Sequence, residues 1–300
     1  SRLVMALFGL VIVLPFGGKD AITFESTAWE WSQKSIIDIL ATINISGSYV
    51  ISSTIALFYH VLERNLAIPV FLNAIIGLFI FYYALVLAHV VWGRRFISKL
   101  FVLIVALHPL LNIYSAVVLR ENYIILALLL ASIHLARFAR DSNMNDLLAF
   151  MLFTVVASFF HGGAILFILG LPAFFVFSNP KVNAQKKIIA SIFFLVSGAI
   201  LLTYVDFGKI SALQDTGLDL ELLQNLEENR QDASTAYLVG MSPSSLYDVL
   251  WQAPLRFLFL IAKPFPWDIT QVNHLFVMFD AILWWLTVYF LIRNWRAVKE

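Results

Sequence analysis

Long apolar runs separated by short polar connections dominate the chain. A bilayer core about 30 Å thick is crossed by a helix of roughly 20 mainly apolar residues. Several runs approach that length, and the remaining ones are short enough to be tilted or half-helices. The expected membrane segments cover residues 2–17, 48–62, 67–92, 100–119, 122–137, 147–160, 163–178, 187–205 and 272–292. The pattern predicts an all-α, polytopic transmembrane helix bundle of about nine or more segments, some of them re-entrant.

Composition supports a membrane protein and narrows its chemistry. Hydrophobic residues make up 61% of the chain and charged residues 13%, whereas soluble domains are about half apolar and about a quarter charged. The net charge of +1 indicates no particular partner, and the lack of cysteine excludes disulfides and thiolate chemistry. There is no P-loop, Rossmann glycine fingerprint, HExxH or GxSxG motif. We therefore expect no metal, no cofactor and no nucleic-acid partner, and neither ATP-driven transport nor metalloprotease chemistry.

Basic residues orient the predicted spans, because cytoplasmic loops carry an excess of Lys and Arg. They cluster in GRRFISK, ARFARDSN, NPKVNAQKK and at the C-terminus, which are alternate connections between spans. The other connections should then face outward: the Arg120–Glu121 corner, FFHGGA at 159–164, and an acidic loop at 206–250. The sequence thus predicts an integral protein of a bacterial cytoplasmic membrane whose site faces outward.

Two further segments do not fit simple spans. Residues 18–46 mix aromatic and polar positions and predict an amphipathic segment on the outer face. Residues 251–268 contain Pro254, Pro264 and Pro266 and predict a re-entrant or interfacial segment, since proline interrupts helices. Non-helical backbone at membrane depth usually lines a cavity. No soluble domain is evident, so we expect the whole chain to form a single membrane domain.

Charged and titratable residues at the outer rim are the first candidates for chemistry. Arg120 departs from the inner clustering of basic residues, and it is either an interfacial anchor paired with Glu121 or a functional cation. His161 precedes Gly162 and Gly163, which let backbone or ligand approach closely. It either caps a tight helical hairpin or acts as a general base or phosphate hydrogen-bond donor.

The remaining candidates each have a plain structural alternative. The re-entrant segment offers cations, an aromatic platform and a carboxylate, namely Arg256, Lys263, Trp267 and Asp268. Possible pocket-lining residues near a helix-breaking proline are His108 and Tyr114. The first outer segment carries carboxylates that are either bases or solvated charges: Asp20, Glu25 and Glu30. Three neighbouring polar residues are expected to be interfacial: His60, Glu63 and Arg64. Aromatic residues that either stack on a glycan or form an interfacial belt are Trp29, Trp31, Tyr237, Tyr247 and Trp251.

The stretch from LHPLLNIYSAVVLREN to ASFFHGGAILFILGLP resembles the EpsG/Wzy-like membrane proteins of polysaccharide assembly. In that family an LR corner opens a span, a short basic loop follows, and the next span ends in SLFH before small residues. The matching positions here are Leu119–Arg120 and Ser158 to His161. KPFPWD at 263–268 also resembles a proline–tryptophan element of repeat-unit polymerases. The likeness covers residues 100–178 well and 251–292 loosely.

The resemblance implies polymerisation of polyprenyl-diphosphate-linked oligosaccharides at the outer face of the membrane. Arginine suits the diphosphate because its planar fork binds two oxygens, which points to Arg120, with Arg256 and Lys263 as further cations. The acceptor hydroxyl then needs a base, for which His161 stands before the carboxylates Glu121, Asp268 and Asp20. Expected partners are the lipid-linked glycan, membrane lipid, and a chain-length regulator or other assembly proteins.

Two other functions fit parts of the pattern. A GT-C-type glycosyltransferase would use a polyprenyl-monophosphate sugar, with Asp20 or Glu25 as base on the first outer segment. A non-enzymatic transporter or assembly subunit for lipid-linked glycans would use the cations at 120, 256 and 263 to bind a headgroup without an essential base.

Overall fold

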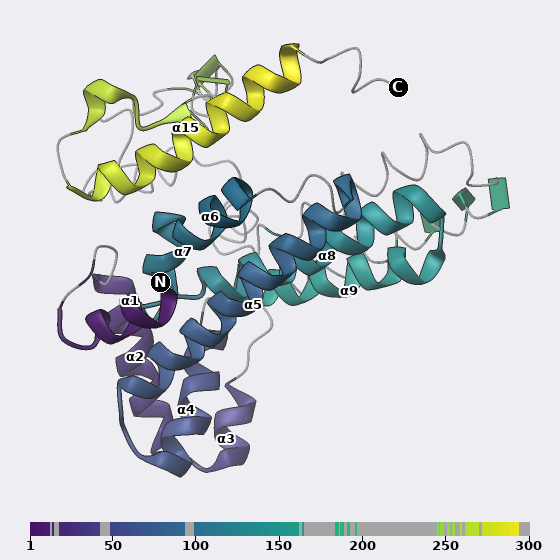
Figure 1. Cartoon of the computed structure of the whole chain (residues 1–300). Helices are drawn as coiled ribbons and strands as arrows, with labels where there is room; N and C mark the ends of the chain where they lie inside the picture. Colours follow the sequence, from purple (N-terminus) through teal and green to yellow (C-terminus); the bar gives the residue numbers. More distant parts are fainter. Residues whose placement is uncertain are drawn as a thin grey trace. The chain divides into compact units, whose positions relative to one another are not determined.

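The computed structural model describes residues 1–12, 14, 18–42, 49–93, 99–161 and 164, and shorter stretches between 184 and 293. They belong to two compact units, Ser1–Gly208 and Lys209–Glu300. Every regular element among these residues is a helix, so the all-α prediction is confirmed for the described part of the chain (Figure 1).

The first unit begins with four short helices, of which α2 and α4 pack together. Their bounds are α1 (Arg2–Gly9), α2 (Lys19–Ser32), α3 (Ile36–Ala41) and α4 (Val50–Leu62). The Ser35 hydroxyl caps α3, because it accepts from the Asp38 amide at 3.2 Å and donates to the Asp38 carboxylate at 2.7 Å. Ser52 on α4 donates to the Phe24 carbonyl of α2 at 2.9 Å. The described part of the expected amphipathic segment is therefore two helices joined by a capped turn.

Longer helices form the rest of this unit: α5 (Ala67–Trp92), α8 (Glu121–Asp141) and α9 (Met144–Phe160). Helices α8 and α9 lie side by side as an antiparallel hairpin (Figure 1). Ser142 ends α8 in the left-handed conformation, and the Asn143 side chain caps α9 by accepting from the Asn145 amide at 3.1 Å. Ala127 and Ala157 form a small-residue contact between the two helices, which allows a close approach.

The apolar run 100–119 is not one continuous helix. It divides into α6 (Lys99–Leu107) and α7 (Pro109–Tyr114), followed by a turn that leads to α8. The cause is Pro109, which disfavours helical backbone at the preceding residue, and His108 has ψ 117°. Asn112 bridges the break by donating to the carbonyls of Ala106 at 3.1 Å and His108 at 2.8 Å. The prediction of a single span over residues 100–119 is therefore wrong, because the helix is interrupted at His108 and α7 ends at Tyr114.

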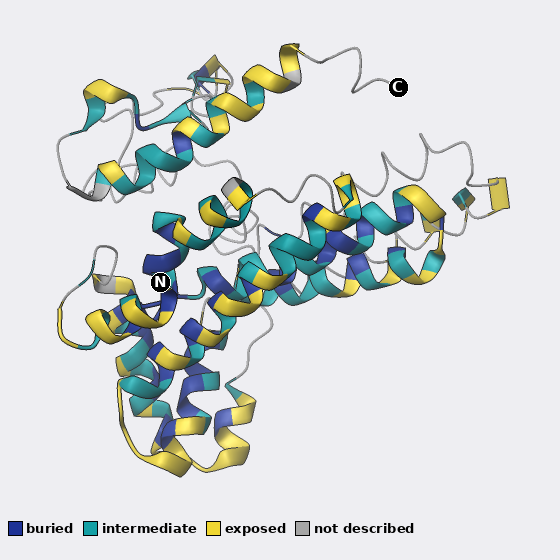
Figure 2. Cartoon of the chain, in the orientation of Figure 1, coloured by how far each residue is buried: buried dark blue, intermediate teal, exposed yellow. Residues whose placement is uncertain are grey.

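Two of the described helices, α5 and α8, are long and apolar enough to cross a membrane. Exposed positions run along several helices (Figure 2), and many of them are large apolar residues; on α5 these include Phe71, Ile75, Leu78, Phe79 and Tyr82. The helix α1 has only 8 residues, which rise about 12 Å, so it is too short for the span expected at 2–17. Helices α4, α5, α8 and α9 match predicted runs within a few residues, whereas 163–178 and most of 187–205 lie outside the described residues.

In the second unit the described elements are η3 (Pro266–Asp268) and α15 (Val272–Arg293), and α15 matches the last predicted span. The Phe265 ring stacks on Trp267 at 5.0 Å and on Trp285 of α15 at 5.8 Å. The Trp285 indole donates to the Ala262 carbonyl at 3.0 Å. These contacts hold the KPFPWD element against α15. Most of the acidic loop 206–250 lies outside the described residues.

Candidate functional site

The turn between α7 and α8 carries Arg120, and Asn73 of α5 fixes its backbone. Asn73 is 1% exposed, and its side-chain amide donates to the carbonyls of Val117 and, at 3.1 Å, Leu119. Asn122 at the start of α8 donates to the Asn73 carbonyl at 3.2 Å. A buried amide pair therefore joins α5 to both sides of Arg120.

Arg120 is the residue before the first turn of α8, and Glu121 is the first residue of that helix. The Arg120 guanidinium carbon lies 5.8 Å from the centre of the Phe24 ring on α2, which is within cation–π range. Arg120 Nη1 and Glu121 Oε2 are both buried, and neither hydrogen bonds to any group in the described part of the chain. Buried polar atoms are normally paired, so this corner has unused hydrogen-bonding capacity for a ligand.

His161 belongs to the same corner. It follows the last residue of α9, and the neighbouring Phe160 ring stacks on Tyr123 of α8 at 5.1 Å. Burial lowers the pKa of His161, the positive charge of Arg120 lowers it further, and the negative charge of Glu121 partly opposes the change. A neutral imidazole near pH 7 can accept a proton. The structure thus brings three sequence candidates, Arg120, Glu121 and His161, into one electrostatic environment.

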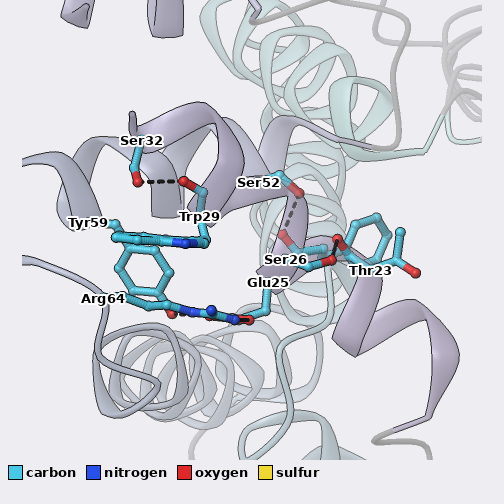
Figure 3. A network of polar contacts seen from close by, with 9 residues as sticks. Thr23, Glu25, Ser26, Trp29, Ser32, Ser52, Tyr59 and Arg64 are labelled. Carbon is cyan, nitrogen blue, oxygen red and sulfur yellow. Dashed lines mark hydrogen bonds and ion pairs between the residues drawn. The ribbon is translucent and has the colours of Figure 1, made fainter. Parts of the chain in front are cut away.

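A second polar cluster connects α2 with the end of α4 (Figure 3). Arg64 binds Glu25 in a bidentate manner, with Nε–Oε1 at 3.0 Å and Nη2–Oε2 at 2.7 Å. The Tyr59 hydroxyl donates to Glu25 Oε1 at 3.0 Å. The Arg64 guanidinium lies 5.6 Å from the Trp29 ring centre, and Trp29 meets Tyr59 edge to face at 6.4 Å. The sequence predicted an interfacial role for Arg64 and did not predict its pairing with Glu25, which is 39 positions away.

The Arg64 hydrogen bond holds the pKa of Glu25 below its ordinary value, although burial acts in the opposite direction. A carboxylate with a lowered pKa is a weaker base, and both Glu25 oxygens already accept hydrogen bonds. Glu25 is therefore poorly placed as the base of a monophosphate-dependent transfer. Asp20 is exposed in the first turn of α2, one helical turn before Phe24.

An apolar cavity of about 350 Å³ lies beside the Arg120 turn. Its walls come from the end of α1 and the residues after it, from α2, from the start of α5, and from residues 116–118 of the turn. Glu25 is the charged residue in its lining. The cavity therefore adjoins both polar clusters of this unit.

The remaining candidates lie elsewhere. His108 caps α7, accepting from the Leu111 amide at 3.5 Å, and the half-buried Tyr114 is the last residue of α7. In the second unit, Lys263 Nζ lies 3.4 Å from the Asp268 carboxylate. The other Asp268 oxygen accepts from the Phe265 amide at 3.0 Å, so this carboxylate stabilises its own loop.

Trp267 is 77% exposed, as an interfacial or ligand-stacking ring would be. Arg256 lies outside the described residues. Comparison of the chain with protein-family models, with curated proteins and with solved structures finds no match in any of the three.

Proposed function

We propose that this protein is a membrane glycosyltransferase that polymerises polyprenyl-diphosphate-linked oligosaccharides at the outer face of a bacterial cytoplasmic membrane. The observation that carries the proposal is the Arg120 corner, where a buried guanidinium nitrogen has no partner among the described residues and the charges of Arg120 and Glu121 act on His161. A cation, a neutral imidazole and a carboxylate are the groups that transfer from a diphosphate leaving group requires.

In the proposed mechanism Arg120 binds the diphosphate of the donor, assisted by the positive N-terminal end of α8. Charge that develops on the departing diphosphate is stabilised there as the glycosidic bond breaks. His161 removes the proton from the acceptor hydroxyl, which then forms the new bond to the anomeric carbon. Glu121 balances the charge and orients Arg120.

Two features support a lipid-linked substrate. Large apolar side chains are exposed along α1, α5, α9 and α15, as expected for helices that contact acyl chains. The apolar cavity beside residues 116–118 has the chemistry to accept the first isoprene units of a polyprenyl tail while Arg120 binds its headgroup. The bundle of about nine segments and its outward orientation belong to this proposal.

The test is reconstitution of the purified protein in lipid with a polyprenyl-diphosphate-linked oligosaccharide, read as a ladder of longer products. Arg120→Ala and His161→Ala should abolish the ladder. Arg140→Ala should retain it, because Arg140 is an exposed arginine at the other end of α8, paired with Asp141. A ladder that persists in both site variants would refute the assignment of the site. A single addition from a monophosphate donor would favour the GT-C reading with Asp20 as base, and headgroup binding without any product would favour a transporter.

A further inference from the structure

A polar cavity of about 550 Å³ opens beside the Glu25–Arg64 pair. Its lining combines aromatic rings with planar polar groups, and it includes Trp29, Gln33, Tyr59, His60, Glu63 and Arg64. Tyr59 is buried and Trp29 is half-buried, whereas the four polar side chains are exposed. The cavity is therefore lined by aromatic rings and by exposed hydrogen-bonding groups; Figure 3 shows Trp29, Tyr59 and Arg64 of this lining. Its volume falls within the range of small-molecule sites, about 300–1,000 Å³.

This combination of groups matches the surface of a sugar. One face of a pyranose presents C–H groups of partial positive charge, which pack on the negative face of an indole ring. The sugar hydroxyls donate and accept at once, so they pair with carboxylate, amide, imidazole and guanidinium groups. His60 is oriented for this purpose, because one ring nitrogen is fixed at 2.8 Å from the Ser32 carbonyl.

The charge of the cavity selects among sugars. Glu25 neutralises Arg64 through two hydrogen bonds, so the guanidinium is not an unpaired anion site. Glu63 adds a negative charge at the rim. The balance disfavours uronic acids and phosphorylated sugars and favours neutral hexoses or N-acetylhexosamines.

The backbone of Glu63 provides an independent indication of function. Its φ of 64° and ψ of 170° lie in a region that is essentially restricted to glycine. Strain of this kind persists where surrounding structure maintains it, and it clusters at ligand sites. A glycine at this position would relieve the strain but would lack the carboxylate. The presence of glutamate there indicates that its side chain has a use that outweighs the strained turn.

We propose that the cavity lined by Trp29 and Glu63 binds one neutral saccharide unit, stacked on Trp29 and hydrogen bonded by Glu63 and His60. This inference rests on the proposed function in one respect: if the protein is a polymerase, the bound saccharide is part of the glycan that is being extended. The binding itself requires neither the lipid diphosphate nor turnover, so it can be measured without them.

The experiment is a saturation-transfer NMR titration of the full chain in lipid nanodiscs with free lactose, cellobiose and chitobiose, and with glucuronic acid as the acidic probe. At least one neutral disaccharide should bind with a Kd of about 1 mM or tighter, and the acid should bind more weakly. Trp29→Ala should weaken the binding by about tenfold or more. The control is Trp31→Ala. Trp31 belongs to the same helix, but its ring packs on Tyr49 and lies outside the cavity. This variant should leave the Kd unchanged.

A second variant guards against a folding defect in Trp29→Ala. Glu63→Gly should preserve or raise Tm, because it relieves the strained backbone, and should still weaken saccharide binding. No binding of any neutral disaccharide, or equal binding by wild type and both cavity variants, would overturn the inference. Saccharide binding without a polymer ladder would leave the cavity assigned and remove the proposed reaction. A polymer ladder without saccharide binding would support the proposed reaction and overturn the assignment of the cavity.

Discussion

Replacing Asn73 with leucine tests whether the turn that presents Arg120 depends on one buried amide. Leucine has a similar size but no donor, so both side-chain hydrogen bonds to the turn are lost. The Val117 carbonyl keeps the bond from the Leu119 amide at 2.9 Å. The Leu119 carbonyl loses the one donor that the described residues provide for it.

The expected loss of stability follows from this difference between the Val117 and Leu119 carbonyls. A buried carbonyl left without a partner costs about 1–3 kcal/mol, and the second lost hydrogen bond contributes about 1 kcal/mol more. We expect Asn73→Leu to lower the free energy of unfolding by about 3 kcal/mol. If each bond contributed only the average of about 0.6 kcal/mol measured between membrane helices, the loss would be about 1 kcal/mol.

The measurement is thermal unfolding of the purified protein in one detergent. A loss of about 3 kcal/mol lowers Tm by roughly 5 °C in a chain of 300 residues, because the entropy of unfolding is about 2.1 cal/mol/K per residue. Asn145→Leu on α9 is the control, because Asn145 is exposed and should change stability by less than about 0.5 kcal/mol. An Asn73→Leu protein as stable as the wild type would refute the reasoning, since apolar packing alone would then hold the turn.

Three further outcomes are expected. Because the paired arginine lowers the pKa of Glu25, its contribution to stability is complete above the ordinary glutamate value of about 4.3 and is lost as pH falls through the lower folded value; wild type should therefore lose more Tm than Glu25→Gln between about pH 6 and pH 3. Gly77→Ala would force a methyl group into the Ser115 side chain and should cost about 1–3 kcal/mol, whereas Gly18→Ala, with open space around it, should cost about 0.5–1 kcal/mol through the poorer N-cap of α2 alone, as measured by Tm. Arg120→Gln should raise the pKa of His161 by removing a neighbouring positive charge, and an NMR titration of the imidazole would show no change if the two residues are not coupled.

Elements that depend on local pattern were predictable from the sequence. The apolar runs locate α5, α8, α9 and α15 to within a few residues, because a helix with many apolar positions needs no long-range information to be recognised. The break at Pro109 was visible as a kink, but the end of α7 at Tyr114 was not. That end depends on the Asn73 amide, which binds the following carbonyls from 44 and 46 residues away.

In the candidate site, too, some residues could be identified from the sequence and some contacts could not. Arg120 could be identified because it departs from the distribution of basic residues, and His161 because two glycines follow it. The pairing of Glu25 with Arg64 could not be foreseen, because either residue alone resembles an interfacial charge. Spacing carries no signal for a contact between two helices whose packing is unknown. The positive φ of Glu63 was equally hidden, since nothing but a glycine at that position would have indicated it.

Helix α2 links the two polar clusters and therefore decides how they can be separated by mutation. Phe24 lies under Arg120, and the next residue, Glu25, binds Arg64. Consecutive residues on a helix point about 100° apart, so one helix presents an aromatic ring to the first cation and a carboxylate to the second. Phe24 is 7% exposed, and its replacement would shift α2 and disturb both clusters at once. Arg120→Ala and Glu63→Gly each change one of the two regions without removing a side chain of α2, so these variants separate transfer from saccharide binding more cleanly than any replacement of Phe24.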